Sequence, residues 1–247
     1  MVGRGIIRIF AVLILLGGIG VLVFPHIAQR FSEREARRVI AEFEQEVYRI
    51  ADDSLRSATA STENSYVTYF DELYAAMQAY NQNIYENKQQ DLKDAFSYQV
   101  ASFDLTEWGF HENIVGYIDM PRMKVKLPIY LGATAETLSK GAGHLTQTSL
   151  PIGGENTNCV LAAHRGMSTA AMFRDIEKLQ IGDELTITNF RETLIYHVAD
   201  IKVIKPTDIH EILIQDGRDL VTLITCHPYR HNYQRYAVFC ERVIDRQ

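Results

Sequence analysis

The chain has 247 residues and a formal net charge of −6, with 25 lysines and arginines against 31 aspartates and glutamates. This length accommodates one sizeable domain and an appendage. No basic tract or ribbon of basic and aromatic residues occurs, so nucleic acid is not an expected partner. Three cysteines are an odd number, so no disulfide framework is indicated and at least one thiol is expected to stay free.

The N-terminal segment predicts a membrane anchor. Between Ile6 and Phe24 the only charged residue is Arg8, and the length matches the roughly 20 residues that an α-helix needs to cross a bilayer. A signal peptide is the alternative, but no small-x-small cleavage site follows Phe24. We expect residues 1–30 to form a cytoplasmic tip and a single transmembrane helix.

The charges that flank this helix disagree about its orientation. Arg4 and Arg8 favour a cytoplasmic N-terminus, whereas four arginines between residues 30 and 38 favour the opposite orientation. Long C-terminal domains cross the membrane largely regardless of such charges. We therefore expect a single-pass protein of the cell membrane whose bulk is extracytoplasmic.

Two amphipathic stripes follow the anchor. Apolar residues at three- and four-residue spacing predict a helix over residues 31–56, with Ser32 and Glu35 in a capping-box pattern. A polar break spans residues 57–65, and a second apolar stripe runs over residues 66–86. The two helices predict a hairpin or bent arm that stands on the membrane. A stalk without contacts to the rest of the chain is the alternative.

From residue 114 the apolar period changes to that of β-strands. Turn residues separate seven predicted strands, at residues 114–119, 127–131, 158–163, 183–188, 193–204, 219–226 and 235–243. Short helices are expected at 135–140 and 170–179. Many short strands with few helices indicate a mainly β fold, either a closed barrel or a sandwich. The predicted divisions are the anchor, a helical arm, a lid-like or connecting segment and a β domain, at residues 1–30, 31–92, 93–113 and 114–247.

Three chemically distinct side chains stand at the ends of apolar runs. Cys226 closes one predicted strand, Arg235 opens the next, and His164 follows an earlier apolar run. A thiol, an imidazole and a guanidinium are the parts needed for thiol-based acyl transfer. Cys159 and Cys240 lie within apolar runs and are expected to be buried.

Residues 222–235 carry a specific resemblance. They read Thr-Leu-Ile-Thr-Cys-His-Pro-Tyr-Arg-His-Asn-Tyr-Gln-Arg, which resembles the signature of sortases, and specifically of pilin-polymerising class C sortases: Thr-Leu-x-Thr-Cys-x-Pro-Tyr-x-x-Asn-x-x-Arg. Residues 161–166 resemble the histidine segment of that family, and residues 141–145 and 150–156 resemble its connecting loops. The resemblance implies an eight-stranded sortase β-barrel and a membrane-bound, extracytoplasmic setting in a Gram-positive bacterium.

The resemblance also implies a reaction. The substrates would be pilins or surface proteins with a C-terminal sorting signal of the Leu-Pro-x-Thr-Gly kind. Cys226 would attack the Thr-Gly carbonyl to form a thioacyl enzyme, and a pilin lysine amine would resolve it. His164 would supply positive charge near the thiol and protonate the leaving amine. Arg235 cannot lose its proton, so we expect it to donate to the developing oxyanion.

A lid-like segment precedes the predicted barrel. Asp94-Ala95-Phe96 resembles the Asp-Pro-aromatic lid of pilin-type sortases. Phe96 would lie against the thiol while Asp94 accepts a hydrogen bond from Arg235 or a nearby donor. Ala95 departs from the pattern and removes the proline that restricts the backbone of Asp94. The alternative interpretation is that these residues are the ordinary end of the second helix.

No cofactor is expected, because no pair or cluster of histidines has zinc spacing and no calcium loop is recognisable. His144 is expected to be structural, and His227 and His231 are expected to be solvated loop residues. Two alternatives to pilin polymerisation stay open: a sortase that anchors surface proteins to peptidoglycan, and a non-catalytic scaffold for pilus assembly.

Overall fold

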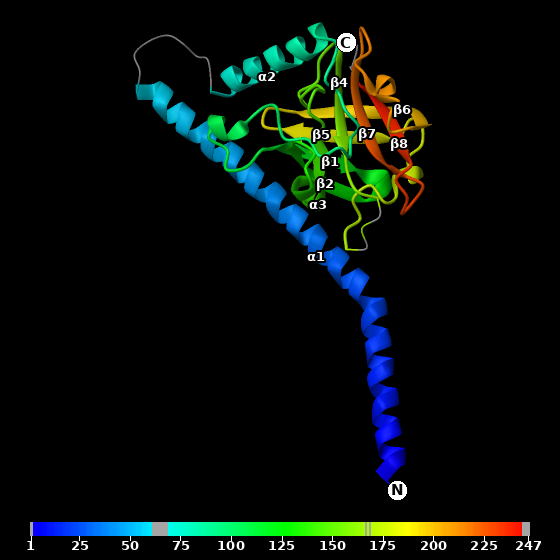
Figure 1. Ribbon diagram of the computed structural model, residues 1–247. Helices are drawn as coiled ribbons and strands as arrows, with labels where there is room; N and C mark the ends of the chain where they lie inside the picture. The colour runs from blue at the N-terminus through cyan, green and yellow to red at the C-terminus, as the bar shows by residue number, and fades with distance from the viewer. Residues whose placement is uncertain (1, 61–68, 166, 168, 244–247) are drawn as a thin grey trace.

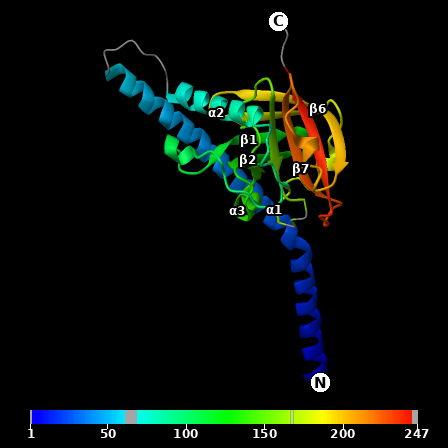
Figure 2. The same cartoon turned by 45° about the horizontal axis from the view of Figure 1, so that its top comes forward.

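The computed structural model describes residues 2–60, 69–165, 167 and 169–243. A long N-terminal helix, α1 (Val2–Ala60), leans along one side of a β-barrel and projects well beyond it at its N-terminal end (Figure 1). A second helix, α2 (Tyr69–Glu86), runs back over the barrel (Figure 2). The N-terminal half of α1 therefore stands apart from the rest of the protein.

α1 is one helix, whereas the sequence predicted an anchor and a separate arm helix. Ser32 and Glu35 lie inside α1, so the predicted capping box is wrong, and the predicted break does not begin before Ala60. The rest of that break, residues 61–68, lies outside the described residues. α1 changes direction before it reaches the barrel (Figure 1) and contains Pro25. A proline removes one backbone hydrogen bond and clashes with the preceding turn, which bends a helix without ending it.

Both helices of the arm pack on the barrel. Ala36, Ile40 and Phe43 are buried, and their three- and four-residue spacing places them on one face of α1. In α2, Asn81 is buried and bonds both ways with Leu150, whose N–H donates to Asn81 Oδ1 at 2.7 Å and whose carbonyl accepts from Nδ2 at 3.3 Å. The alternative of a stalk without contacts is therefore wrong.

The eight-stranded closed barrel implied by the resemblance is confirmed. Its strands, in chain order, are β1 (Ile114–Met120), β2 (Val125–Leu131), β3 (Ala142–His144), β4 (Thr157–Ala162), β5 (Glu184–Asn189), β6 (Thr193–Ile204), β7 (Asp219–His227) and β8 (Gln234–Arg242). Around the barrel they follow the order β1-β2-β3-β4-β7-β8-β6-β5. Seven of these strands were predicted, and β3 was taken for a loop.

Short helices join the strands. α3 (Ala135–Lys140) has the predicted bounds. The helix predicted over residues 170–179 is wrong: that stretch contains turns and one short 3₁₀ helix, η3 (Ile176–Lys178). The other 3₁₀ helices are η1 (Leu105–Trp108), η2 (Pro121–Met123) and η4 (Ile209–Ile212).

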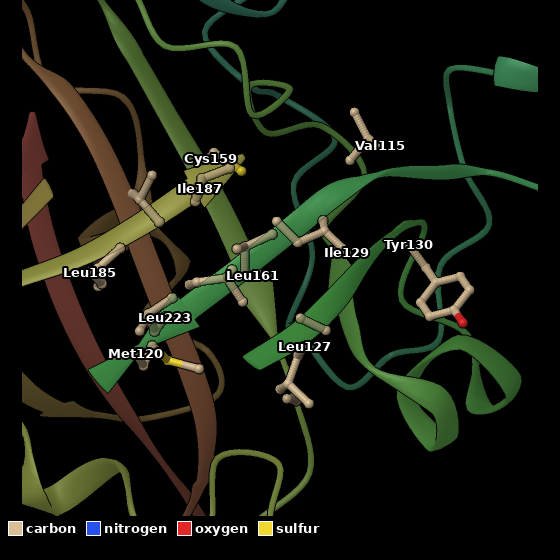
Figure 3. Packing of buried hydrophobic residues seen from close by; sticks show 14 of the residues in the cluster. Val115, Met120, Leu127, Ile129, Tyr130, Cys159, Leu161, Leu185, Ile187 and Leu223 are labelled. Carbon is tan, nitrogen blue, oxygen red and sulfur yellow. The ribbon is translucent and has the colours of Figure 1, made fainter. Parts of the chain in front are cut away.

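Two hydrophobic clusters lie on the two faces of β4, β7 and β8. The first occupies the barrel interior, where Leu161, Leu185 and Leu223 converge, whereas Tyr130 points to the other side of β2 (Figure 3). The second contains alternate residues of the same strands, such as Ile224 of β7, together with Ala95. Because successive strand residues face opposite ways, the second cluster lies on the outer surface of β4, β7 and β8. The predicted lid segment covers it.

Candidate active site

Strand register brings the three predicted catalytic residues to one end of three adjacent strands. In the antiparallel pair β7–β8, Cys226 lies directly opposite Arg235. In the parallel pair β4–β7, Ala162 is level with Ile224. His164 follows two residues after Ala162, as Cys226 follows Ile224, so this register places His164 at the same barrel end as Cys226. Cys226 and Arg235, which follow His164 by 62 and 71 positions in the sequence, thus share one site with it.

The guanidinium of Arg235 uses four of its five N–H donors in hydrogen bonds to described residues. Its Nε and Nη2 donate to Asp94 Oδ1 and Oδ2 at 2.8 and 2.7 Å, which is the bidentate arrangement of a strong ion pair. Its Nη1 donates to the carbonyls of Asn232 and Gln234 at 2.8 and 3.0 Å and lies 3.9 Å from Cys226 Sγ. The contact that the resemblance implied between Asp94 and Arg235 is present. In this conformation described residues engage four of the five N–H donors of Arg235, and Asp94 holds two of these four.

The ring of Phe96 packs against Arg235 and His164. Its ring centroid lies 5.1 Å from the Arg235 guanidinium carbon and 6.1 Å from the centroid of the His164 ring. The first contact is a cation–π interaction. α2 ends at Glu86, and turns and irregular chain lead from there to Asp94. The interpretation of residues 94–96 as the end of the second helix is therefore wrong.

The turn keeps its shape although alanine stands where the family pattern has proline. Ala95 is completely buried. The carbonyl of Asp94 accepts from Ser97 N at 3.0 Å, Ser97 Oγ at 2.8 Å and Gln99 Nε2 at 3.1 Å, and Asp94 Oδ2 accepts from Phe96 N at 3.2 Å. Local hydrogen bonds, as in other Asx turns, fix the backbone that a proline ring would restrict.

Burial keeps the two candidate reacting groups uncharged. Burial raises the pKa of the Cys226 thiol, and the Asp94 carboxylate adds to the rise, whereas Arg235 and Arg165 oppose it. Burial also lowers the pKa of His164. Near neutral pH the site therefore holds a thiol beside a neutral imidazole. The positive charge that His164 was expected to supply is absent from this covered arrangement.

A second group of residues behind Cys226 was not foreseen as part of the site. Arg165 is buried and contacts His227, whose side chain is 20% exposed rather than solvated as predicted. Glu177 of η3 and Tyr236 of β8 also contact Arg165. The one sequence signal was the position of Arg165 directly after His164.

The remaining cysteines and His144 fit the sequence interpretation. Cys159 and Cys240 are buried, and burial raises the pKa of each thiol. His144 is buried, bonds to Thr148 Oγ1 and the Ser149 carbonyl, and has a pKa lowered to about 4 by burial. Within the described ranges no group of three or more potential ligands could hold a metal ion.

Known proteins share this sequence pattern and this fold. A family model described as the sortase domain matches residues 118–243. Sortase D of Bacillus subtilis is 29% identical over 131 residues, which are 52% of this chain and 63% of that protein, less than two thirds of its length. The structure of Sortase C of Streptococcus pneumoniae is 31% identical with a TM-score of 0.69 over 84% of this chain and 97% of that chain. Sortase C-1 of Actinomyces oris is 38% identical with a TM-score of 0.63 over 72% of this chain and 99% of that chain.

Proposed function

This chain belongs to the sortase family, and on that premise we propose that it is a membrane-anchored cysteine transpeptidase that joins pilins. The observation that carries the proposal is the meeting of Cys226, Arg235 and His164 at one barrel end, covered by Asp94 and Phe96. The solved structure of the Streptococcus pneumoniae relative is described as giving insight into pilin substrate specificity. That likeness favours pilins as substrates here.

The proposed reaction begins when the lid opens. Departure of Asp94 frees two donors of Arg235, and water that enters the site favours the charged forms of Cys226 and His164. The thiol proton passes to His164, and the sulfur attacks the carbonyl of the scissile bond in the sorting signal. The oxyanion accepts hydrogen bonds from Arg235. The C–N bond then breaks as His164 returns the proton to the leaving amine, which leaves a thioester on Cys226.

The second half of the reaction transfers the acyl group. A neutral lysine amine attacks the thioester carbonyl, a new C–N bond forms, and the Cys226 sulfur departs with the electron pair of the C–S bond. His164 accepts the proton that the amine loses. Water would compete for the same thioester, so transfer to an amine requires a site that restricts water. Phe96 and Asp94 occupy the position from which they can provide such restriction.

The N-terminal half of α1 supports membrane anchoring. Among the described residues one helix is long and apolar enough to cross a bilayer, with a mean hydropathy of 2.4 in its most apolar window. Its side chains from Phe10 to Phe24 are exposed. A bilayer would bury them. The orientation we propose places the barrel outside the cytoplasm.

Incubation with a purified pilin that carries a sorting signal tests the proposed function. Ladders of covalent multimers support pilin joining, whereas transfer to a wall-peptide amine without ladders supports anchoring of surface proteins to peptidoglycan. Cys226→Ala is the control. If that variant still forms full product, the catalytic proposal fails and a scaffold role replaces it.

A further inference from the structure

Arg165 is a buried cation whose partners all belong to the barrel domain. Its side chain is 3% exposed and its Nη2 lies 2.7 Å from Glu177 Oε2. Its Nη1 donates to His227 Nδ1 at 2.9 Å, and its guanidinium carbon lies 5.7 Å from the ring centroid of Tyr236. The ring of His227 stacks beside that of Tyr236 at 5.6 Å between centroids. The Nε of Arg165 is buried and has no hydrogen-bond partner among the residues that the structure describes.

The position of this cluster follows from strand alternation. Cys226 and Arg235 share the outer face with Ile224 and the lid. Tyr236 lies two residues before Val238, whose side chain faces the barrel interior, so both point to the same side of β8. The contact of Tyr236 with Arg165 therefore places that guanidinium at the inner mouth of the barrel. The thiol and Arg165 therefore lie on the two sides of the same strand ends. The apolar interior weakens a field much less than water does.

The effect of the other positive groups near Cys226 depends on whether the lid is closed or open. Arg235 is neutralised by Asp94 when the lid is closed and is engaged with the substrate when it is open. His164 has a pKa lowered by burial, so it is uncharged in the closed site. A nearby positive charge lowers the pKa of a thiol, and a cation that does not bond to the lid supplies this charge whether the lid is closed or open. Arg165 is such a cation, because its contacts with described residues do not involve the lid.

We propose that Arg165 is a positioning residue of this reaction: a fixed positive charge at the barrel mouth that supports the Cys226 thiolate while Arg235 is engaged elsewhere. The inference rests on the proposed role of Cys226 as nucleophile. Glu177, at 51% exposure, is screened by water more than the buried guanidinium it pairs with. His227 Nδ1 lies 2.9 Å from Arg165 Nη1 and 3.5 Å from Glu177 Oε1. The charge of Arg165 acts to lower the pKa of Cys226, in the same direction as Arg235 and against burial and Asp94.

The test is the pH dependence of Cys226 alkylation by iodoacetamide in the full chain, with Asp94→Ala in every variant to keep the lid open. Arg165→Gln should raise the midpoint by about one pH unit, equivalent to a tenfold loss of thiolate at neutral pH. Arg165→Lys, which keeps the charge, should restore most of the shift. Glu177→Gln should move the midpoint in the opposite direction, downward, because it removes a negative charge. The midpoint is the appropriate readout, since a thiolate of higher pKa is also a stronger nucleophile and the rate alone understates the change.

A merely structural role for Arg165 gives different results. The inference is overturned by an unchanged midpoint in Arg165→Gln, or by shifts of the same sign in Arg165→Gln and Glu177→Gln. If Arg165→Gln does not fold, Glu177→Gln decides alone: a downward shift supports the inference, and no shift or an upward one refutes it. Arg191→Gln is the matched control, because Arg191 pairs with Asp71 at 2.9 Å and stacks on Tyr74 away from the thiol. It should not move the midpoint. Alkylation needs no sorting signal, so these results stand whether or not the chain joins pilins.

Discussion

Removal of the Asp94 carboxylate is the sharpest perturbation of the closed site. Asp94→Ala deletes both acceptors of the bidentate pair with Arg235, whose side chain is 6% exposed while that of Asp94 is 23% exposed. A hydrogen bond to a charged group contributes about 1.5–3 kcal/mol. Water replaces part of the two hydrogen bonds when the lid opens. We therefore expect the pair to contribute about 2–4 kcal/mol to the free energy that favours the closed lid. With a factor of ten for each 1.4 kcal/mol, the open population rises about 30-fold to 700-fold.

Alkylation of Cys226 measures this population directly. If iodoacetamide reaches the thiol only through the open lid, the rate in Asp94→Ala should rise by the same factor, up to the rate of a permanently open site. Phe96→Ala removes the cover without changing the charge. It loses a cation–π contact of about 1 kcal/mol, so a rise of about fivefold is expected. Cys159 and Cys240 are buried and serve as internal controls for global unfolding.

Two outcomes separate occlusion from other effects. Asp71→Ala removes a carboxylate from a more exposed arginine pair, Asp71–Arg191, and should leave the Cys226 rate unchanged. Rates within twofold of the parent protein in both Asp94→Ala and Phe96→Ala would refute the lid. A rise confined to Asp94→Ala would show that the carboxylate acts by charge alone.

Four further outcomes follow from the structure. Because the Asp94 carboxylate raises the pKa of Cys226, the alkylation midpoint of Asp94→Ala should lie at lower pH than that of the parent protein; an upward shift would contradict the electrostatics. Arg235→Ala should show opposite signs in two assays: faster alkylation, because Asp94 loses its anchor, and at least about 100-fold slower acylation by a sorting-signal peptide. His164→Ala should slow acylation by about 100-fold or more without speeding alkylation comparably. Gly116→Ala should lower the free energy of unfolding by about 2 kcal/mol and Tm by about 4–8 °C, because a Cβ there would lie 2.1 Å from the Thr188 carbonyl oxygen; an unchanged thermal unfolding curve would refute this.

Periodic patterns of apolar residues predicted most of the strands. Strands such as β6 alternate buried and exposed residues, and its predicted bounds agree with the structure. β3 was not predicted, because three residues around Gly143 are too few to show a period. The sequence predicted two helices where α1 is one, because the change from uniformly apolar to amphipathic residues resembles a helix boundary. The helix in fact continues through Pro25.

The site was predictable in its residue types and only partly in its geometry. Cys226 and Arg235 are close enough in sequence for a hairpin to pair them. The parallel register that brings His164 beside them, and the contact of Asp94 with Arg235 across 141 positions, cannot be obtained from spacing. The resemblance to a family supplied both. The sequence did not predict Arg165 as part of the site, because an arginine after a strand is usually exposed. Its place at the barrel mouth is known only from the structure.

Intact-mass spectrometry of the chain mixed with a short Leu-Pro-x-Thr-Gly peptide tests the central assignment most directly. The account predicts an acyl adduct on Cys226, more abundant in Asp94→Ala and absent from Asp94→Ala with Cys226→Ala. The contradicting result is an Asp94→Ala protein whose Cys226 is readily alkylated yet never acylated by any such peptide, or an adduct that persists when Cys226 is replaced.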